Sequence, residues 1–274
     1  MEIEIDLTKS VDENASFYFN ESKLARKKVE GLKRALDLAQ QKVLKREELS
    51  AKKELMLKQK KEKAKISKKW FYSFRWFFTS DNLLVVGGRD ASSNEKIVKN
   101  RMKKNDVYFH AEVFGAPHCI IVAPEKLKGG EFVCPSSSMN EAAVFAATFS
   151  KAWEEARPLA DVYSVKPEQV SKSTKSGESM GTGAFMIYGE RNWFKKTVLS
   201  CAIGYFPREQ RLMCGPLSAI KFHCKNFFEL VQGSKSKEVI SRELKSLFEK
   251  KGLFFDLDEF VSILPNGKFE LKLK

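Results

Sequence analysis

The sequence contains no apolar run long enough to cross a lipid bilayer, and its acidic, polar start does not predict a signal peptide. Histidine is scarce: the three residues form no HxxxH pair, so no metal site is expected. The five cysteines are odd in number and lack CxxC spacing, which favours reduced thiols in a cytoplasmic protein over disulfides or a zinc site. Neither GxGxxG nor GxxxxGK(S/T) occurs, which excludes these two nucleotide-binding fingerprints. We therefore expect no cofactor and no membrane partner.

Positive charge is concentrated in parts of the sequence. The net charge is +14, and residues 21–69 hold 18 lysines and arginines against seven acidic residues. Residues 70–190 are balanced at 14 and 14, whereas residues 191–274 have 16 basic and nine acidic residues. A helix face that is merely solvated does not require one sign of charge. The excess over residues 21–69 therefore indicates a polyanionic partner.

The segment with the largest excess has the composition of a long helix. Residues 17–69 contain no proline and a single glycine, and apolar residues recur at coiled-coil spacings of three and four at Val29, Leu32, Leu36, Ala39 and Val43. We expect residues 15–69 to form a projecting basic coiled-coil hairpin with its tip near residues 45–51, after an extended lead-in over residues 1–14. One long helix is the alternative. The residues of this arm expected to contact RNA are Lys42, Lys45, Arg46, Lys52 and Lys53.

The remainder of the chain predicts a globular α/β (α+β) region with a mixed sheet. Strand-like segments lie at residues 83–86, 107–110, 118–122, 162–165 and 185–188, and helix-like segments lie at residues 91–102 and 140–156. We divide it into a domain over residues 70–193 and a small basic α/β extension over residues 194–274. The dense aromatic run at residues 70–78 is expected in the core rather than as a base-stacking platform.

A glycine corner lies between a predicted strand and a predicted helix. The sequence GGRD at residues 87–90 allows a sharp turn and a close approach of the backbone to a partner, and Arg89 can bind a phosphate through two hydrogen bonds. Asp90 is placed to cap the following helix as well as to contact RNA. Asn94, one helical turn further on, and Arg75, in the aromatic run, complete this set of candidate RNA contacts.

Two further features add candidate contacts. His110 ends a predicted strand near Glu112, but no serine or cysteine nucleophile with a partner is evident, so a hydrolase using His110, Asp90 and Glu112 is not expected. We take His110 as an RNA contact. The polar loop over residues 166–183 can wrap a phosphate backbone through Lys166, Lys172 and Lys175. An ordinary solvated loop is the alternative.

Five ordered motifs resemble the RNA-binding domain of the NFACT family: GGRDASSNE, VYFHAEVFGAP, NEAAVFAATFSKAW, DVYSVKPEQVSK and GAFMIYGERNW. The resemblance is dense over residues 70–193, extends to residues 3–69 and thins after residue 194. The family includes ribosome quality control factors of eukaryotes, bacteria and archaea. Its amino-terminal domain, with the residues implicated in engaging tRNA for tail addition, has no counterpart among these 274 residues. We therefore do not expect tail addition by this chain alone.

The resemblance implies a non-enzymatic, cytoplasmic RNA-binding factor. Its expected partner is a large ribosomal subunit that still carries peptidyl-tRNA after a stalled ribosome has split, contacted at ribosomal RNA and at protein of the stalk base. In a eukaryote, the resemblance also implies assistance to a ubiquitin ligase. Two alternatives remain: a general RNA- or DNA-binding module with no preference for stalled ribosomes, and a coiled-coil scaffold without salt-dependent RNA affinity.

Overall fold

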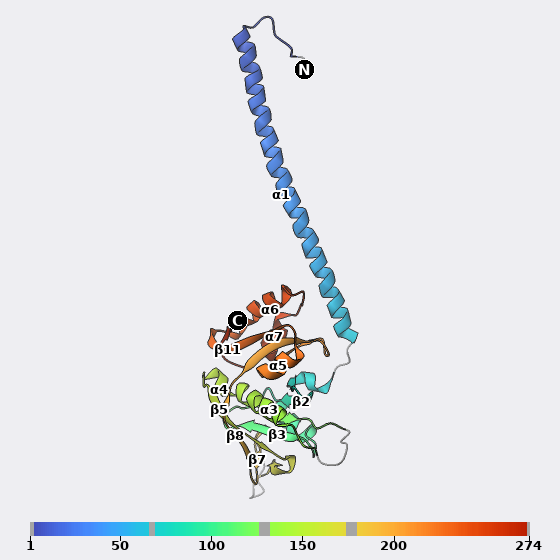
Figure 1. Ribbon diagram of the computed structural model, residues 1–274, viewed down its shortest axis with the longest axis vertical. Coiled ribbons are helices and arrows are strands. Elements are labelled where there is room, and N and C mark those ends of the chain that lie inside the picture. Colours follow the sequence, from blue (N-terminus) through green and yellow to red (C-terminus); the bar gives the residue numbers. More distant parts are fainter. Residues whose placement is uncertain (1–2, 66–68, 126–131, 174–179, 273–274) are drawn as a thin grey trace. The chain divides into compact units, whose positions relative to one another are not determined.

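A computed structural model describes the chain apart from residues 1–2, 66–68, 126–131, 174–179 and 273–274 (Figure 1). The chain divides into two units, Met1–Glu62 and Lys63–Lys274. Within the described residues, no helix is both long enough and apolar enough to cross a membrane.

The first unit is built on one continuous helix, α1 (Val11–Lys65). This corrects the expected hairpin, because the chain remains helical through residues 45–51, where we placed the tip. Those residues include good helix formers and no glycine or proline to reverse the chain, and the next turn carries an ion pair of 3.0 Å between Lys58 Nζ and Glu54 Oε1. The apolar seam is open to solvent: Leu32 and Leu36 are 70% and 59% exposed.

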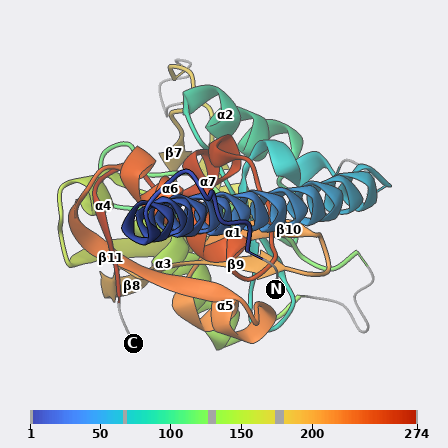
Figure 2. The ribbon, with the colours of Figure 1, turned by 90° about the horizontal axis from the view of Figure 1, so that it is seen from above.

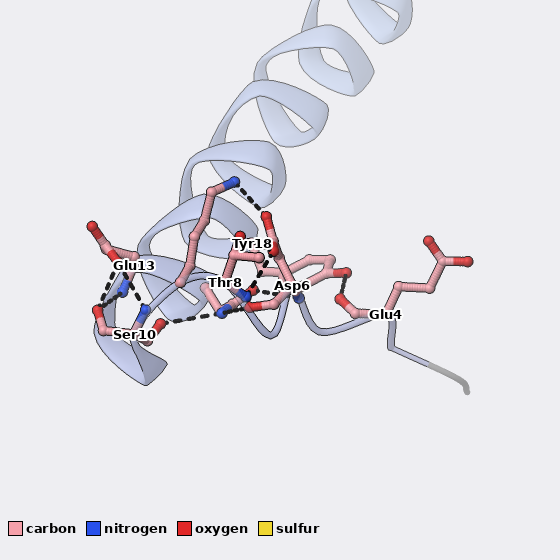
Figure 3. A network of polar contacts seen from close by, with 8 residues as sticks. Glu4, Asp6, Thr8, Ser10, Glu13 and Tyr18 are labelled. Atoms are coloured by element: carbon pink, nitrogen blue, oxygen red, sulfur yellow. Dashed lines mark hydrogen bonds and ion pairs between the residues drawn. The ribbon is translucent and has the colours of Figure 1, made fainter.

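The lead-in to α1 is shorter than expected and contains no strand over residues 3–10. A polar network fixes the start of the helix (Figure 3). The Ser10 N–H donates to Glu13 Oε2 at 2.8 Å, and the Glu13 N–H donates back to Ser10 Oγ at 3.3 Å. Asn14 forms a second reciprocal pair with the backbone of Asp6, with both distances at 3.0 Å. The Ser10–Glu13 pair satisfies N–H groups that a helix start leaves without partners, and the Asn14–Asp6 pair holds the preceding segment to the first turn, which explains why α1 begins at Val11.

Six strands form the larger sheet of the globular unit, in the order β1-β2-β4-β3-β5-β8. They are β1 (Arg75–Phe78), β2 (Leu84–Gly87), β3 (Val107–Ala111), β4 (Cys119–Ile121), β5 (Leu159–Val165) and β8 (Asn192–Val198). Every neighbouring pair is antiparallel, which corrects the mixed sheet that we expected. The short connections from β1 to β2 and from β3 to β4 favour this arrangement, because a parallel pair needs a long crossover.

A second antiparallel sheet follows in the order β10-β9-β11-β12. Its strands are β9 (Cys201–Phe206), β10 (Arg211–Gly215), β11 (Phe227–Lys235) and β12 (Phe269–Leu271), and the helices that contact it are α5 (Leu217–His223), α6 (Lys237–Glu249) and α7 (Leu257–Ile263). A two-stranded ribbon, β6 (Val170–Ser171) with β7 (Met186–Ile187), follows the short helix η2 (Pro167–Gln169). The expected division after residue 193 falls inside β8.

Three helices belong to the first part of the globule: α2 (Ala91–Asn100), α3 (Ser136–Thr148) and α4 (Lys151–Glu154). α3 contacts β3, β4, β5 and β8. Its buried Glu141 accepts hydrogen bonds from the Ser80 N–H at 2.8 Å and from Ser218 Oγ at 2.6 Å, which ties α3 to the turn after β1 and to α5. In the view of Figure 2, α2 and α5 lie at opposite edges of the globular unit.

The aromatic run forms part of the core, as predicted. It comprises the short helix η1 (Trp70–Ser73) and strand β1, and its buried rings are Phe71, Phe74, Trp76, Phe77 and Phe78. The ring centroids of Phe77 and Phe145 on α3 are 4.8 Å apart, which packs the strand against the helix. The run is therefore enclosed and offers no open platform for bases.

Candidate nucleic-acid interface

A cleft of about 510 Å³ opens on the larger sheet. A Cβ on Gly87 would lie 2.9 Å from both Cys119 Sγ and the Phe145 ring, so Cys119 faces α3. Because side chains alternate along a strand, its neighbour His118 points to the opposite face, where the cleft lies. The volume lies within the range of small-ligand sites. Five of the residues that we expected to contact RNA line this one cleft: Arg75, Arg89, Asp90, Asn94 and His110.

The glycine corner shapes one wall of the cleft. A Cβ on Gly88 would lie 1.8 Å from Asn94 Oδ1, so the side chain of Asn94 requires glycine at this position. The same Oδ1 accepts a hydrogen bond from the His118 N–H at 3.0 Å, which links α2 to the start of β4. Asp90 caps α2 by accepting the Ser93 N–H at 2.8 Å, and this bond lowers the pKa of its carboxyl group. Asp90 and Asn94 therefore organise the wall as well as line it.

Two guanidinium groups lie at one end of the cleft. Arg75 Nη1 donates to the Gly88 carbonyl at 2.9 Å, and Arg89 Nη2 donates to the Phe74 carbonyl at 3.1 Å. Burial lowers the pKa of both groups, and the neighbouring Arg89 lowers that of Arg75 further. Among the described residues neither forms an ion pair, and Arg75 Nε is buried without a hydrogen-bond partner. The Asp90 carboxylate is near both groups but forms no ion pair with them among the described residues, so the two adjacent cations favour an anionic ligand.

Two neutral imidazoles form the floor of the cleft. The Tyr108 hydroxyl lies 2.6 Å from His118 Nδ1, and His110 Nδ1 lies 3.3 Å from the Pro117 carbonyl. Burial lowers the pKa of His110 to about 4 and that of His118 to about 3. Both rings are therefore uncharged at neutral pH. We assign the Tyr108 hydroxyl as the donor to His118 and His110 Nδ1–H as the donor to Pro117, which leaves His110 Nε2 as an acceptor.

We expect the melting temperature to fall as the pH is lowered from about 6.5 towards 5. In the unfolded chain both imidazoles bind protons below about 6.5, whereas in the folded protein they stay neutral until about 4 and about 3, so acid favours unfolding. Calorimetry between pH 6.5 and 5 measures the melting temperature. Most carboxyl groups titrate below this window, so they contribute little to the change. A His118→Phe variant removes one of the two groups and should show a shallower fall. Equal slopes for the two proteins would contradict the assignment.

Lys172 has a structural role that the sequence did not indicate. Its Nζ lies 3.0 Å from Glu95 Oε2 on α2 and donates to the Gly181 carbonyl at 2.8 Å. Glu95 Oε2 also accepts the Gly183 N–H at 2.8 Å. These contacts hold the described end of the loop, residues 180–185, against α2. Part of this segment lines the cleft.

The remaining predicted contacts lie elsewhere. Lys166 precedes η2 and does not line the cleft, and Lys175 lies outside the described residues. The five cations predicted for the arm all lie on α1, where Lys42, Lys45, Arg46 and Lys53 are exposed and Lys52 is half-buried. α1 thus carries a basic surface in the first unit, and the cleft belongs to the second unit.

Several cleft residues were missed by sequence reasoning. Tyr108, His118, Tyr163 and Phe185 all line the cleft, but none was predicted as a contact. Alternation along β3 could have placed Tyr108 on the same face as His110. Tyr163 could not be found in this way, because its place beside His110 depends on the pairing of β3 with β5, which are distant in sequence.

Residues 73–189 match the sequence model of the NFACT protein RNA binding domain. This span contains every residue that lines the cleft. The globular unit thus carries an RNA-binding domain of a defined type.

Curated relatives resemble the chain beyond that domain. The archaeal Rqc2 homolog aRqcH of Methanocaldococcus jannaschii is 33% identical over 218 residues, which cover 79% of this chain and 31% of that protein. The ribosome quality control complex subunit NEMF homolog of Drosophila melanogaster is 38% identical over 73% of this chain and 20% of its own length. Human ribosome quality control complex subunit NEMF is 34% identical over 65% of this chain and 16% of its own length. The chain belongs to the NFACT family and spans less than a third of these relatives.

Proposed function

We propose that this chain is a non-enzymatic, cytoplasmic factor of ribosome quality control. It binds a large ribosomal subunit that remains obstructed with peptidyl-tRNA after a stalled ribosome has split. Ribosomal RNA, protein of the stalk base and the peptidyl-tRNA are its partners, together with a ubiquitin ligase in a eukaryotic cell. The observation that carries the proposal is the RNA-binding domain match at residues 73–189, in a chain whose relatives are named as ribosome quality control subunits.

The charge of the two units supports RNA as the ligand. The cleft presents Arg75 and Arg89 without carboxylate partners among the described residues, and α1 carries a basic excess along its exposed surface. Lysine and arginine neutralise phosphates and release counterions, so affinity should fall steeply with salt. In the proposal, α1 supplies sequence-independent attraction to RNA, and the cleft supplies a more restrictive contact.

Co-sedimentation tests the proposal. The purified chain is mixed with split large subunits that carry or lack peptidyl-tRNA, with intact ribosomes, and with a free RNA duplex as competitor, over a salt series. We expect preferential recovery with the obstructed subunit, even when duplex is in excess. Equal binding to every RNA would instead identify a general nucleic-acid binder, and no binding would refute the RNA-binding proposal.

A further inference from the structure

Three aromatic side chains form a row across the face of the sheet that carries the cleft. His110 on β3 lies directly opposite Tyr163 on β5, and Tyr163 lies directly opposite Trp193 on β8. Their ring centroids are 6.0 Å apart between His110 and Tyr163 and 5.4 Å apart between Tyr163 and Trp193. We call these three residues the ring row. It crosses three neighbouring strands and reaches the edge of the sheet at β8.

The ring row is continuous with the cleft. His110 and Tyr163 both line the cleft, and the His110 ring lies 4.6 Å from the ring of His118. At the other end, Trp193 is 36% exposed, although a side chain of this size is usually well covered. The row therefore leads from an enclosed site to an open edge.

Cations lie over the rings at the open end. The Arg191 guanidinium carbon is 4.5 Å from the Tyr163 ring centroid and 5.7 Å from that of Trp193, and Lys195 Nζ is 3.8 Å from the Trp193 centroid. Lys195 is paired with Asp161 at 3.0 Å, whereas the ion pair of Arg191 with Glu112 is longer, at 3.8 Å. A guanidinium plane beside an exposed indole can stack on a base and bind a phosphate at the same time.

We infer that the ring row is a stacking surface for single-stranded RNA. One base stacks on Trp193 and Arg191, and the strand runs over His110 into the cleft, where Arg75 and Arg89 bind a phosphate. Neighbouring strands are about 5 Å apart, so the row spans about 10 Å, room for about two bases. This inference rests on the proposed RNA binding and specifies the form of RNA that the globular unit takes.

The chemistry of the row favours an unpaired strand over a duplex. In a duplex the base faces are stacked on one another and cannot reach Trp193, whereas a single strand exposes them. The neutral His110 ring adds no charge and offers Nε2 as an acceptor for a 2′-hydroxyl or a base amino group. Phosphate attraction alone would not distinguish the two forms.

Substitution of Trp193 tests the inference. Binding of the full chain to a short oligouridylate, to an RNA duplex and to an abasic strand of the same length is measured by fluorescence anisotropy. We expect Trp193→Leu to weaken oligouridylate binding about tenfold or more. Its affinity for the duplex and for the abasic strand should equal that of the wild type. Trp193→Phe, which keeps a ring, should recover most of the affinity. The salt dependence should be the same in all three proteins, because no phosphate contact is removed.

Tryptophan emission gives a direct second reading. The sequence has four tryptophans, of which Trp76 and Trp153 are buried and Trp70 is half-buried, so Trp193 is the exposed reporter. Stacking should quench emission when oligouridylate binds, and Trp193→Phe should abolish the quench. The inference would be overturned by any of three results. The quench could persist in Trp193→Phe, Trp193→Leu could bind oligouridylate as tightly as the wild type, or Trp193→Leu could lose affinity equally for oligouridylate, the duplex and the abasic strand. Co-sedimentation of the wild-type chain with obstructed subunits is scored separately, so failure here leaves the proposed function standing.

Discussion

Replacing Glu209 by alanine is expected to lower the free energy of unfolding of the globular unit by about 3 kcal/mol. The Glu209 side chain is fully buried. One carboxylate oxygen lies 2.6 Å from Lys69 Nζ, and the other accepts the Tyr72 hydroxyl at 2.6 Å. Alanine removes both bonds and leaves a cavity between η1 and the turn that joins β9 to β10. Lys69 is 37% exposed and can be partly hydrated, so the loss should lie near the lower end for a broken buried pair.

Urea denaturation followed by circular dichroism measures this loss. Glu243→Ala is a matched control, because Glu243 pairs with Lys235 at 2.9 Å on a more exposed surface, and its removal should cost less than about 1 kcal/mol. Glu209→Gln keeps the volume of the side chain and one acceptor for Tyr72. Its loss in the free energy of unfolding should therefore lie between those of Glu209→Ala and Glu243→Ala. If Glu209→Ala and Glu243→Ala were equally stable, the buried carboxylate would not have the role assigned to it.

Neutralising the cations of α1 should give the largest change in RNA affinity. We expect glutamine at Lys42, Lys45, Arg46, Lys52 and Lys53 to lower the affinity for a long RNA by about a hundredfold or more at low salt. Each phosphate contact contributes about 0.7 to 0.9 to the slope of log K against log salt, so the slope should fall by up to about 4. Glutamine and lysine have similar helix propensities, so α1 itself should persist.

A salt series with fluorescence anisotropy measures the affinity and the slope together. Arginine at the four lysine positions keeps the charge and should leave both values near those of the wild type. An unchanged slope in the glutamine variant would mean that these five residues do not neutralise phosphates. The basic residues of the globular unit would then have to account for the salt dependence.

Much of the cleft could be predicted because its signals are local. The sequence placed GGRD between a strand and a helix, and the structure has β2, the corner and α2 in that order, with Asp90 capping the helix. Strand alternation also accounts for the placement of His118 and Cys119, because Cys119 lies on the side of Phe145 whereas His118 lines the cleft. Local order and strand alternation suffice for such predictions.

The predictions that were wrong concern features of the fold that local sequence patterns do not determine. Periodicity indicates a strand but not its direction, so the sheet was expected to be mixed although all its pairs are antiparallel. The coiled-coil seam indicates that α1 can pair but not where the chain turns, and nothing in residues 45–51 ends the helix. The ring row could not be predicted from the sequence either. It arises from the register between strands that are far apart in sequence.

The two imidazoles on the floor of the cleft do not titrate near neutral pH, so they do not make the charge of the cleft depend on pH there. Both are neutral in the folded protein well below physiological pH, whereas the guanidinium groups nearby remain charged. Between pH 6 and 8 neither imidazole changes its protonation state, so the two rings contribute no change in charge to the cleft throughout this range. If the cleft binds RNA as proposed, its affinity should therefore depend on salt concentration and stay nearly constant over this pH range.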